Sequence, residues 1–392
     1  MRMKKIMIFA VAVLTLAACS KTFDHSKAAT EGNAIGFGTW AETLTKARAT
    51  ASDNTAFANG EKFDVYGFKT TASGNSVVFN GDDVTATVSE STVTWDYTPH
   101  RFWDPSASSY TFFAVLPAGK LADEGANPYA TTGKFTSTPI TFSNPTSLAD
   151  DILVANKEVV NGASSSSSAP YSYTNPVQIK FNHVATGVEL YVKQDNNLGD
   201  GAVVKVTALS LLNISNKGTF TVSDYEGTDS VVPTVSWTED TTPTYLGTSN
   251  EYKVLDAATD SDDVTASGKT TYTNHAASAT VTGAKVFDGY VFMPQTLHPT
   301  DGEDTAPVQQ IKLSYTIQVG TEAPNVYTDI VFNIRNFQAT DTDNNSGTDI
   351  TAWAPKTKYV YTMTIGAKAI EFSATVKNWE STVSEGYHYL VN

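Results

Sequence analysis

The sequence is short of several residue types, and each shortage excludes a class of protein. A single cysteine excludes a disulfide scaffold and a multi-cysteine metal site. The six histidines are scattered, with no pair at metal-ligand spacing, so no histidine metal motif is expected. Charged residues make up only 17% of the 392 residues, and the net charge is −15. A protein that binds nucleic acid needs a basic surface to neutralise phosphates, so that class is excluded as well.

The residues that are abundant indicate β-structure. The chain contains 56 threonines, 19 phenylalanines and 18 tyrosines, and these residue types favour strands. A hydrophobic content of 41% is enough for a sizeable core. The composition therefore excludes a helical bundle and a wholly disordered chain, and the length suits two or three domains.

The N-terminus has the pattern of a secretion signal. Arg2, Lys4 and Lys5 form a basic region, and residues 6–18 form an uncharged run. This run is shorter than the roughly 20 residues that span a bilayer, and it suits the apolar part of a signal peptide. We therefore predict that residues 1–18 are a signal peptide.

The sequence Leu16-Ala17-Ala18-Cys19 resembles a bacterial lipobox, in which the cysteine thiol receives a diacylglyceryl group. The alternative is an ordinary signal peptide with a cysteine nearby. Because Cys19 is the one cysteine in the chain, we favour the lipoprotein. Ser20 follows, and the resemblance then implies delivery to the outer membrane, where the acyl chains anchor the protein.

The rest of the chain is a series of short segments with strand-like patterns, bounded by Gly, Asn, Asp or Pro. The expected strands are 35–40, 63–68, 76–79, 92–97, 110–116, 152–155, 177–181, 187–193, 203–212, 218–222, 279–281, 286–293, 309–318, 327–334, 358–365, 369–376 and 386–391. This spacing predicts two β-sandwiches. The serine-rich segment 161–175 is the expected boundary between them, and 177–181 with 187–193 is expected to form a hairpin.

Residues that could carry catalysis or bind a cofactor are few. Gly36-x-Gly38-x-x-Ala41 matches a loose dinucleotide fingerprint, but no helix is expected after it to hold a pyrophosphate. Asp341-x-Asp343-x-Asn345 begins like a calcium loop, yet Ser346 and Ala352 stand where that loop needs Gly and Glu. No Gly-x-Ser-x-Gly motif is present. We therefore predict no enzymatic activity, no catalytic residue, no metal and no cofactor other than lipid on Cys19.

One of the four arginines has an unusual setting. Arg101 and Arg335 lie in or beside aromatic-rich strand segments, where stacking or a surface ion pair would occupy them. Arg48 lies instead in Lys46-Ala47-Arg48-Ala49, within a loop rich in Thr and Ala. Such a loop suits a protease, which must draw the backbone into its cleft. A plain solvated arginine is the alternative that these residues leave open.

The order of several segments resembles the fimbrillins, the subunits of type V pili, which include outer-membrane lipoprotein precursors of the major and minor fimbrillin kind. The segments are Cys19 with its lipobox, 35–40, the basic site at Arg48, 63–68, 95–97, 101–103, 110–114, 151–155, 179–183, 353–361, 370–372 and 376–379.

The resemblance implies two transthyretin-like β-sandwich domains in tandem and a maturation route. After the signal peptide 1–18 come a propeptide 19–48 with the first strand, an N-terminal sandwich 49–175 and a C-terminal sandwich 176–392. An arginine- or lysine-specific protease is expected to cut after Arg48, so that the mature chain begins at Ala49, with Lys46 as a weaker site. The propeptide then leaves.

The same resemblance implies assembly by exchange of strands. The strand that leaves contains Ile35, Phe37 and Trp40. The expected donor strand, near the C-terminus of another subunit, contains Tyr387, Tyr389, Leu390 and Val391. A strand added to an open sheet edge restores its hydrogen bonds, and a head-to-tail contact of this kind propagates as a fibre.

The predicted function is therefore that of a structural subunit of a surface pilus, exported as an outer-membrane lipoprotein precursor and serving adhesion. Its partners would be other fimbrillin subunits, the maturation protease and, through its lipid, the outer membrane. The alternatives are a surface lipoprotein that binds glycan or a host protein without polymerising, and a tip or anchor fimbrillin.

Overall fold

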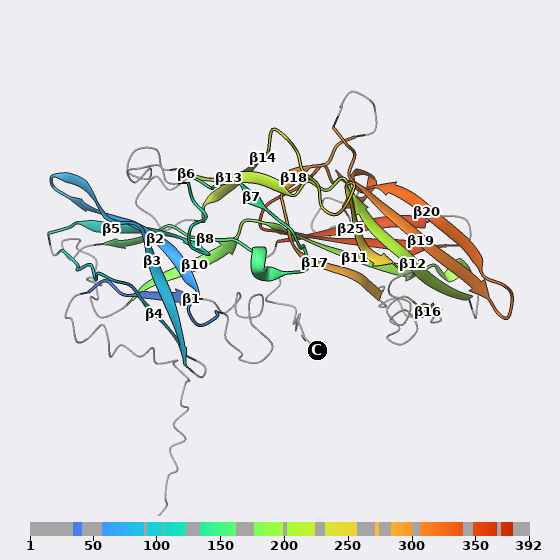
Figure 1. Ribbon diagram of the computed structural model, residues 1–392, viewed down its shortest axis with the longest axis horizontal. Coiled ribbons are helices and arrows are strands. Elements are labelled where there is room, and N and C mark those ends of the chain that lie inside the picture. The colour runs from blue at the N-terminus through green and yellow to red at the C-terminus, as the bar shows by residue number, and fades with distance from the viewer. Residues whose placement is uncertain are drawn as a thin grey trace, which may run out of the picture.

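The fold is all β, as predicted. The computed structural model describes residues 34–40, 57–89, 92–104, 106–122, 134–161, 176–198, 202–223, 232–256, 271–273, 284–299, 306–339, 348–366 and 370–378. The helical elements within these ranges are three-residue 3₁₀ turns: η2 (Leu148–Asp150), η3 (Asn196–Leu198) and η4 (Ile334–Asn336). The N-terminal strands lie at one end of an elongated molecule and the C-terminal strands at the other (Figure 1).

An eight-stranded sheet builds the N-terminal half. In spatial order its strands are β1 (Phe37–Trp40), β10 (Val177–His183), β8 (Leu153–Ala155), β5 (Ser109–Leu116), β2 (Lys62–Thr71), β3 (Gly74–Ser89) and β4 (Thr92–Asp96), with β9 (Glu158–Asn161) also paired to β5. The strand next to β1 in space thus comes about 140 residues later in the chain.

A four-stranded sheet covers this half on one side and connects it to the rest of the molecule. It consists of β14 (Thr234–Glu239), β13 (Lys217–Ser223), β6 (Phe135–Thr136) and β7 (Ile140–Thr141). The strand β5 is therefore buried on both faces. The Phe112 ring lies 5.8 Å from the ring of Phe37 on one side, while the Phe113 ring stacks at 4.4 Å on Phe135 of β6 on the other.

Two sheets build the C-terminal half. The six-stranded sheet has the order β17 (Ala284–Phe292), β11 (Thr186–Gln194), β24 (Thr357–Ile365), β25 (Ile370–Asn378), β21 (Gln338–Ala339) and β22 (Thr348–Asp349). The five-stranded sheet has the order β15 (Glu251–Asp256), β12 (Ala202–Leu212), β19 (Gln310–Val319) and β20 (Asn325–Asn333), with β16 (Thr271–Thr273) beside β12. A short pair, β18 (Gln295–Thr296) and β23 (Ala352–Trp353), lies apart from them. Between the two sheets lies the second core, which contains Leu190 and Tyr361 of the six-stranded sheet and Leu209 and Leu313 of the five-stranded sheet, all fully buried.

The hairpin expected from 177–181 and 187–193 is wrong. The strand β10 pairs with β1 and β8, whereas β11 pairs with β17 and β24. The cause is that the two strands bury their apolar side chains in different cores: Phe181 packs at 5.7 Å from Phe63, and Val188 lies in the C-terminal core. The sheets therefore change between His183 and Thr186, so β10 belongs to the N-terminal sheet although the sequence-based division falls at 175.

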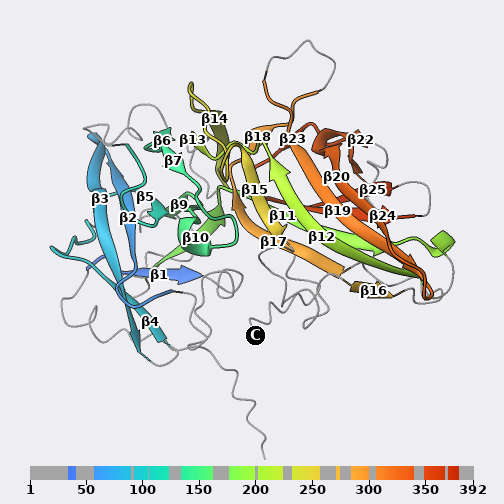
Figure 2. The same ribbon diagram turned by 45° about the vertical axis from the view of Figure 1, so that its right-hand side comes forward.

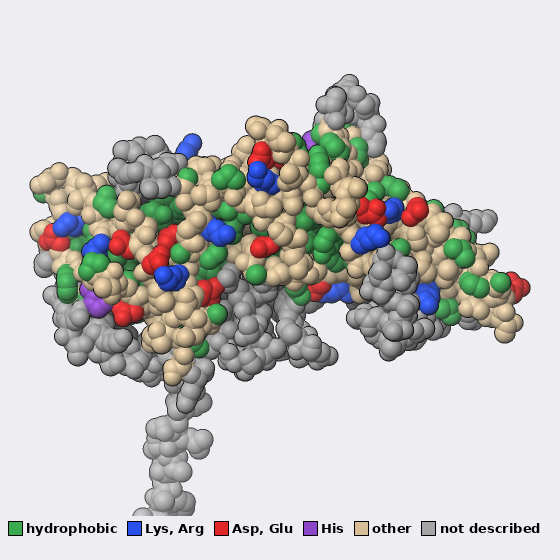
Figure 3. All heavy atoms as spheres, in the orientation of Figure 1, with side chains coloured by type: hydrophobic (Ala, Val, Ile, Leu, Met, Phe, Trp, Pro, Cys, Tyr) green, Lys and Arg blue, Asp and Glu red, His purple; other side chains and the backbone are tan. Residues whose placement is uncertain are grey.

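The surface carries charges of both signs. On the face shown in Figure 3, acidic and basic side chains are interspersed, and hydrophobic side chains occur in small groups. Arg101 is one of the paired cations, with Nη2 3.0 Å from Asp82 Oδ1, as expected for an arginine beside an aromatic strand. His183 is buried, and its Nδ1 lies 2.9 Å from Asp151 Oδ2. It is therefore a paired histidine of the sheet rather than a metal ligand.

One buried carboxyl makes the stability of this half depend on pH. Asp64 of β2 is 6% exposed, accepts a 2.6 Å hydrogen bond from the Gly119 N–H and lies opposite Asp83. Burial, and to a lesser degree the charge of Asp83, raise the pKa of Asp64 to about 6. Because the folded pKa lies above the unfolded value, the folded state is favoured most when Asp64 is protonated, and stability falls as the pH rises from about 4 to about 6.

Asp64→Asn removes this titration while keeping an oxygen that can accept the Gly119 N–H. We expect the variant to be more stable than the wild type above pH 6, by about 1–3 kcal/mol, and to lose the decline between pH 4 and 6. Urea unfolding at several pH values measures this. Asp240→Asn, which alters a surface ion pair with Lys217, should change the free energy of unfolding little and leave the decline in place, because surface ion pairs contribute little. A wild-type curve without the decline would contradict the prediction.

Candidate functional site

The candidate site is the place in the N-terminal sheet that the first strand occupies. The strand β1 runs parallel to β10, with Phe37 opposite Val177 and Trp40 opposite Lys180. Just before β1, the Val177 N–H donates a 2.8 Å hydrogen bond to the Gly36 carbonyl. One side of β1 is thus held by β10.

The residues before β1 are held by the other end of the same sheet. Ala34 forms an antiparallel bridge with Phe102, and the Ile35 N–H donates a 2.8 Å hydrogen bond to the Arg101 carbonyl. The Tyr97 hydroxyl donates to the Ile35 carbonyl at 2.7 Å. These partners follow β4, the last strand of the sheet, so residues 34–40 join its two ends. Figure 2 shows β1 crossing between β4 and β10. We call residues 97–102 and 177–180 the strand seat.

Phe37 places its ring at the centre of the first core. Its centroid lies 5.3 Å from Phe79, 5.6 Å from Tyr97, 5.8 Å from Phe112 and 6.1 Å from Phe63. Three of these four contacts are edge-to-face, the favoured arrangement for aromatic rings. The first strand therefore contributes a large side chain to the core as well as backbone hydrogen bonds.

The two glycines of this segment have different surroundings. A Cβ placed on Gly38 would lie 2.9 Å from Gln178 Nε2, the end of an exposed and flexible side chain, so a larger residue there would displace that amide group. A Cβ on Gly36 would meet Pro176 at an ordinary 3.8 Å. The close approach at Gly38 is thus that of the end of a side chain.

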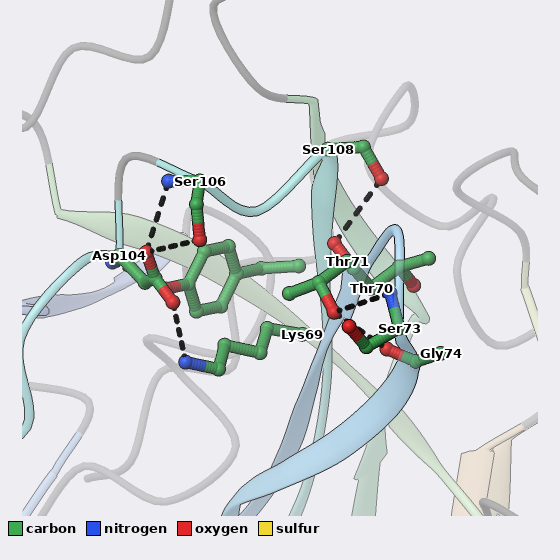
Figure 4. A network of polar contacts seen from close by, with 9 residues as sticks. Lys69, Thr70, Thr71, Ser73, Gly74, Asp104, Ser106 and Ser108 are labelled. Carbon is green, nitrogen blue, oxygen red and sulfur yellow. Dashed lines mark hydrogen bonds and ion pairs between the residues drawn. The ribbon is translucent and has the colours of Figure 1, made fainter.

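The loop that forms half of the strand seat is fixed by charged residues. Arg101 Nε donates to the Val78 carbonyl at 3.2 Å, in addition to its ion pair with Asp82. At the other end of the loop, Asp104 Oδ2 lies 2.6 Å from Lys69 Nζ, and Asp104 Oδ1 accepts from the Ser106 N–H at 2.9 Å (Figure 4). The Lys69 ammonium and the Ser106 donors hold the pKa of Asp104 well below its usual range. These contacts attach the loop to β2 and β3 independently of its contacts with residues 34–35.

Tyr97 is the polar group closest to the strand. Its hydroxyl oxygen accepts from the Arg101 N–H at 3.1 Å while its hydrogen is donated to Ile35. Burial raises the pKa of Tyr97 to about 12, so the hydroxyl stays protonated and able to donate at any physiological pH. The sequence places Tyr97 in the expected strand 92–97, but no local pattern indicates its partner 62 residues upstream.

The predicted site residues divide into two groups. Ile35 and Phe37 are buried at the strand seat, and Trp40 ends β1. The remaining ones lie outside the described residues: Cys19, Lys46, Arg48, Ala49, Tyr387, Tyr389, Leu390 and Val391. Lipidation, cleavage and strand donation thus stay predictions.

Metal and membrane sites were also sought in the part of the chain that the structure describes. It contains no group of three or more His, Cys, Asp or Glu side chains able to hold a metal ion. It also contains no helix with the length and hydrophobicity needed to cross a membrane.

Comparison with known families agrees with this architecture. Residues 47–379 match the model of the family described as fimbrillin-like, which is most of the chain. The chain belongs to the fimbrillin-like family. The resemblance to fimbrillins inferred from the order of the segments is therefore confirmed.

Two individual relatives of this fimbrillin-like chain were compared. It is 27% identical over 219 residues to the fimbrium subunit Fim1C of Phocaeicola vulgatus, a match that covers 53% of this chain and 56% of that protein. The chain thus spans about half the length of the curated relative it matches. The crystal structure of a fimbrial protein from Bacteroides vulgatus has the same fold, with a TM-score of 0.51 at 18% identity, covering 89% of this chain and all of that one.

Phe37→Ala tests whether the first strand is part of the core. Loss of a buried phenylalanine should lower the free energy of unfolding of the N-terminal half by about 3–5 kcal/mol. Urea unfolding followed by tryptophan fluorescence measures it. Phe102→Ala, at a neighbouring but 53% exposed phenylalanine, is the matched control and should change stability by about 0.5 kcal/mol or less. Equal effects of the two substitutions would contradict the assignment.

Proposed function

We propose that this chain is a structural, non-enzymatic subunit of a surface pilus and that it polymerises by exchanging its first strand. The observation that carries the proposal is the position of residues 34–40. They close the N-terminal sheet and fill its core with Phe37, yet their partners in the strand seat come from residues 97–102 and 177–180. A cut between β1 and β2 would leave the strand held by non-covalent contacts alone.

Departure of the strand would be costly without a replacement. Backbone N–H and C=O groups of β10 and of residues 97–102 would lose their partners, and buried groups of this kind are rarely left unpaired. Phe79 and Phe112, both fully buried, would lose the ring between them. A strand from another subunit would restore both the hydrogen bonds and the apolar contact. The contact is head to tail, so it extends into a filament.

The maturation route follows the sequence-based expectations. The precursor is exported by the signal peptide 1–18 and lipidated on Cys19, which anchors it in the outer membrane. An arginine- or lysine-specific protease cuts after Arg48, with Lys46 as a second site, and the mature chain begins at Ala49. In support, the match to the family model begins at residue 47 and leaves β1 outside it. Both halves are proposed to be transthyretin-like sandwiches.

Family membership supports this function, since the relative that matches half of the chain is a fimbrium subunit. Adhesion is the proposed purpose of the filament. A tip subunit is a further alternative. A lipoprotein that stays anchored and binds glycan or a host protein, or an anchor subunit, would keep its first strand. These alternatives are therefore distinguished by the fate of residues 19–48.

Digestion of the purified precursor with a trypsin-like protease tests the cleavage step. We expect a new N-terminus at Ala49, found by mass spectrometry, and a ladder of SDS-resistant oligomers on a gel of unboiled samples. The double variant Lys46→Ala/Arg48→Ala should remain a monomer with its first strand. Lys27→Ala, a basic residue of the same propeptide upstream of β1, should still polymerise. Cleavage after Arg48 that yields only monomers would rule out the filament subunit.

The donor strand is tested separately, in the cleaved protein. Tyr387, Tyr389 and Val391 alternate along one face of the expected strand. We expect Tyr387→Ser/Tyr389→Ser, which places hydroxyls where an aromatic core needs rings, to give folded monomers without a ladder. His388→Ser alters the opposite face and should leave the ladder intact. A ladder in the double variant, or after deletion of residues 386–392, would place the donor strand elsewhere.

A further inference from the structure

Three neighbouring strands of the six-stranded sheet carry a cluster of charges that the proposed function does not use. Asp288 of β17 lies directly opposite Glu189 of β11, and Lys358 of β24 lies diagonally across from Glu189 on its other side. The order β17-β11-β24 thus places a carboxyl, a second carboxyl and an amine side by side.

The amine and the central carboxylate are in close contact and are buried. Lys358 Nζ lies 2.6 Å from Glu189 Oε1, and their side chains are 7% and 5% exposed. The same Nζ lies 4.0 Å from Asp288 Oδ1. One amine therefore lies within reach of two carboxyls at once.

The two oxygens of Asp288 have different surroundings. Oδ2 accepts from Lys285 Nζ at 2.9 Å and from the Tyr290 hydroxyl at 3.3 Å. Oδ1, the oxygen near Lys358, is buried and has no hydrogen-bond partner among the described residues. A buried polar atom without a partner is uncommon and needs an explanation.

The two carboxyls also differ in protonation. Burial and the charge of Glu189 raise the pKa of Asp288 against the lowering effect of Lys285. Burial acts to raise the pKa of Glu189, but Lys358 and Lys285 together hold that pKa below the usual value. Asp288 is thus the carboxyl that keeps a proton more readily, and Glu189 is the one that stays an anion.

We propose that Lys358 and Asp288 condense into an intramolecular amide, a covalent cross-link between β24 and β17. The geometry supplies each part of the reaction. Glu189 Oε1 is in position to accept a proton from Lys358, Lys285 and Tyr290 are in position to stabilise negative charge on Asp288 Oδ2, and Oδ1 is the oxygen that leaves.

The step balances without an outside reagent. Glu189 takes one proton from the Lys358 ammonium, and the nitrogen lone pair attacks Cγ of the protonated Asp288. The C–N bond forms and negative charge collects on Oδ2. The Cγ–Oδ1 bond then breaks, and Oδ1 leaves as water with its own hydrogen and one from the nitrogen. The amide nitrogen keeps one hydrogen, and the first proton remains on Glu189 until solvent removes it.

The other pairings in the cluster are less suited to condensation. Glu189 Oε1 is shared between Lys358 and Lys285, at 2.6 and 2.9 Å, and a carboxylate held by two ammonium groups is a poor electrophile. Lys285 Nζ lies 2.9 Å from Glu189 Oε1 and 2.9 Å from Asp288 Oδ2, and these hydrogen bonds raise its pKa despite its burial, so Lys285 is held as an ammonium between the two carboxyls. We assign the cross-link to Lys358 because it is the amine that lies near Asp288 Oδ1, the oxygen without a hydrogen-bond partner.

Tryptic digestion of the full, folded wild-type protein, denatured just before the digest, tests the cross-link. Cleavage after Lys285 and Lys312 gives the peptide 286–312, and an amidated Lys358 gives the uncleaved peptide 357–368. We expect one branched peptide that joins the two, with the summed mass less one water. Two separate peptides, with cleavage after Lys358, would overturn the proposal.

The same digest contains its own control. Lys312 Nζ lies 2.6 Å from Glu251 Oε1 at a half-exposed site, and trypsin should still cleave after Lys312, because an ion pair alone does not block the amine. Asp288→Ala and Glu189→Gln should each abolish the branched peptide. A branched peptide that persists in Glu189→Gln would overturn the role of Glu189 as proton acceptor. Should a variant fail to fold, the wild-type digest still decides the proposal.

Discussion

The N-terminal half depends on the closure of its sheet by seven residues that precede every other strand. Residues 34–40 pair with β10 at one end of the eight-stranded sheet and with Arg101 and Phe102 beyond its other end. The ring of Phe37 then lies among the aromatic side chains that the curved sheet encloses. Edge strands normally leave backbone groups unpaired, and this short segment supplies partners to backbone groups of β10 and of Arg101 and Phe102.

The closing segment combines two kinds of contact with different demands on sequence. Any strand in this position could form its backbone hydrogen bonds, because they join only main-chain atoms of the segment to Val177, Arg101 and the Tyr97 hydroxyl. The pocket of Phe37 instead selects a large apolar side chain. A replacement strand must therefore satisfy a pattern rather than an exact sequence. Arg101 and Asp104 tie the loop to Asp82 and Lys69, which would limit the entropy cost of binding a strand there.

Local sequence predicted the class of fold and most strands, because alternation and turn residues are local signals. It also placed Ile35 and Phe37 in an early strand. The pattern failed where distant residues decide. The expected strand ended at Phe79, yet β3 continues to Ser89, with Gly81 at φ 78° and a register shift against β2. The parallel pairing of β1 with β10 and the hydrogen bond of Tyr97 likewise join residues far apart in sequence. The fimbrillin resemblance supplied the idea of a displaced strand, which periodicity alone does not contain.

The two halves handle their weak points differently. The N-terminal half is closed by a segment that a cut could release. The C-terminal half instead carries a cluster of charged side chains on three adjacent strands of one sheet. Burying Lys358 with Glu189 gains little stability, because desolvation offsets the attraction and hydrophobic residues would often serve as well. Asp288 Oδ1, buried without a partner, adds a further cost. In the proposed amide, Lys358 and Asp288 would be uncharged and the unpaired oxygen Oδ1 would be gone, while Glu189 would keep its ion pair with Lys285. In a subunit that loses its first strand from the N-terminal half, the proposed amide would still join β17 and β24 of the C-terminal half covalently.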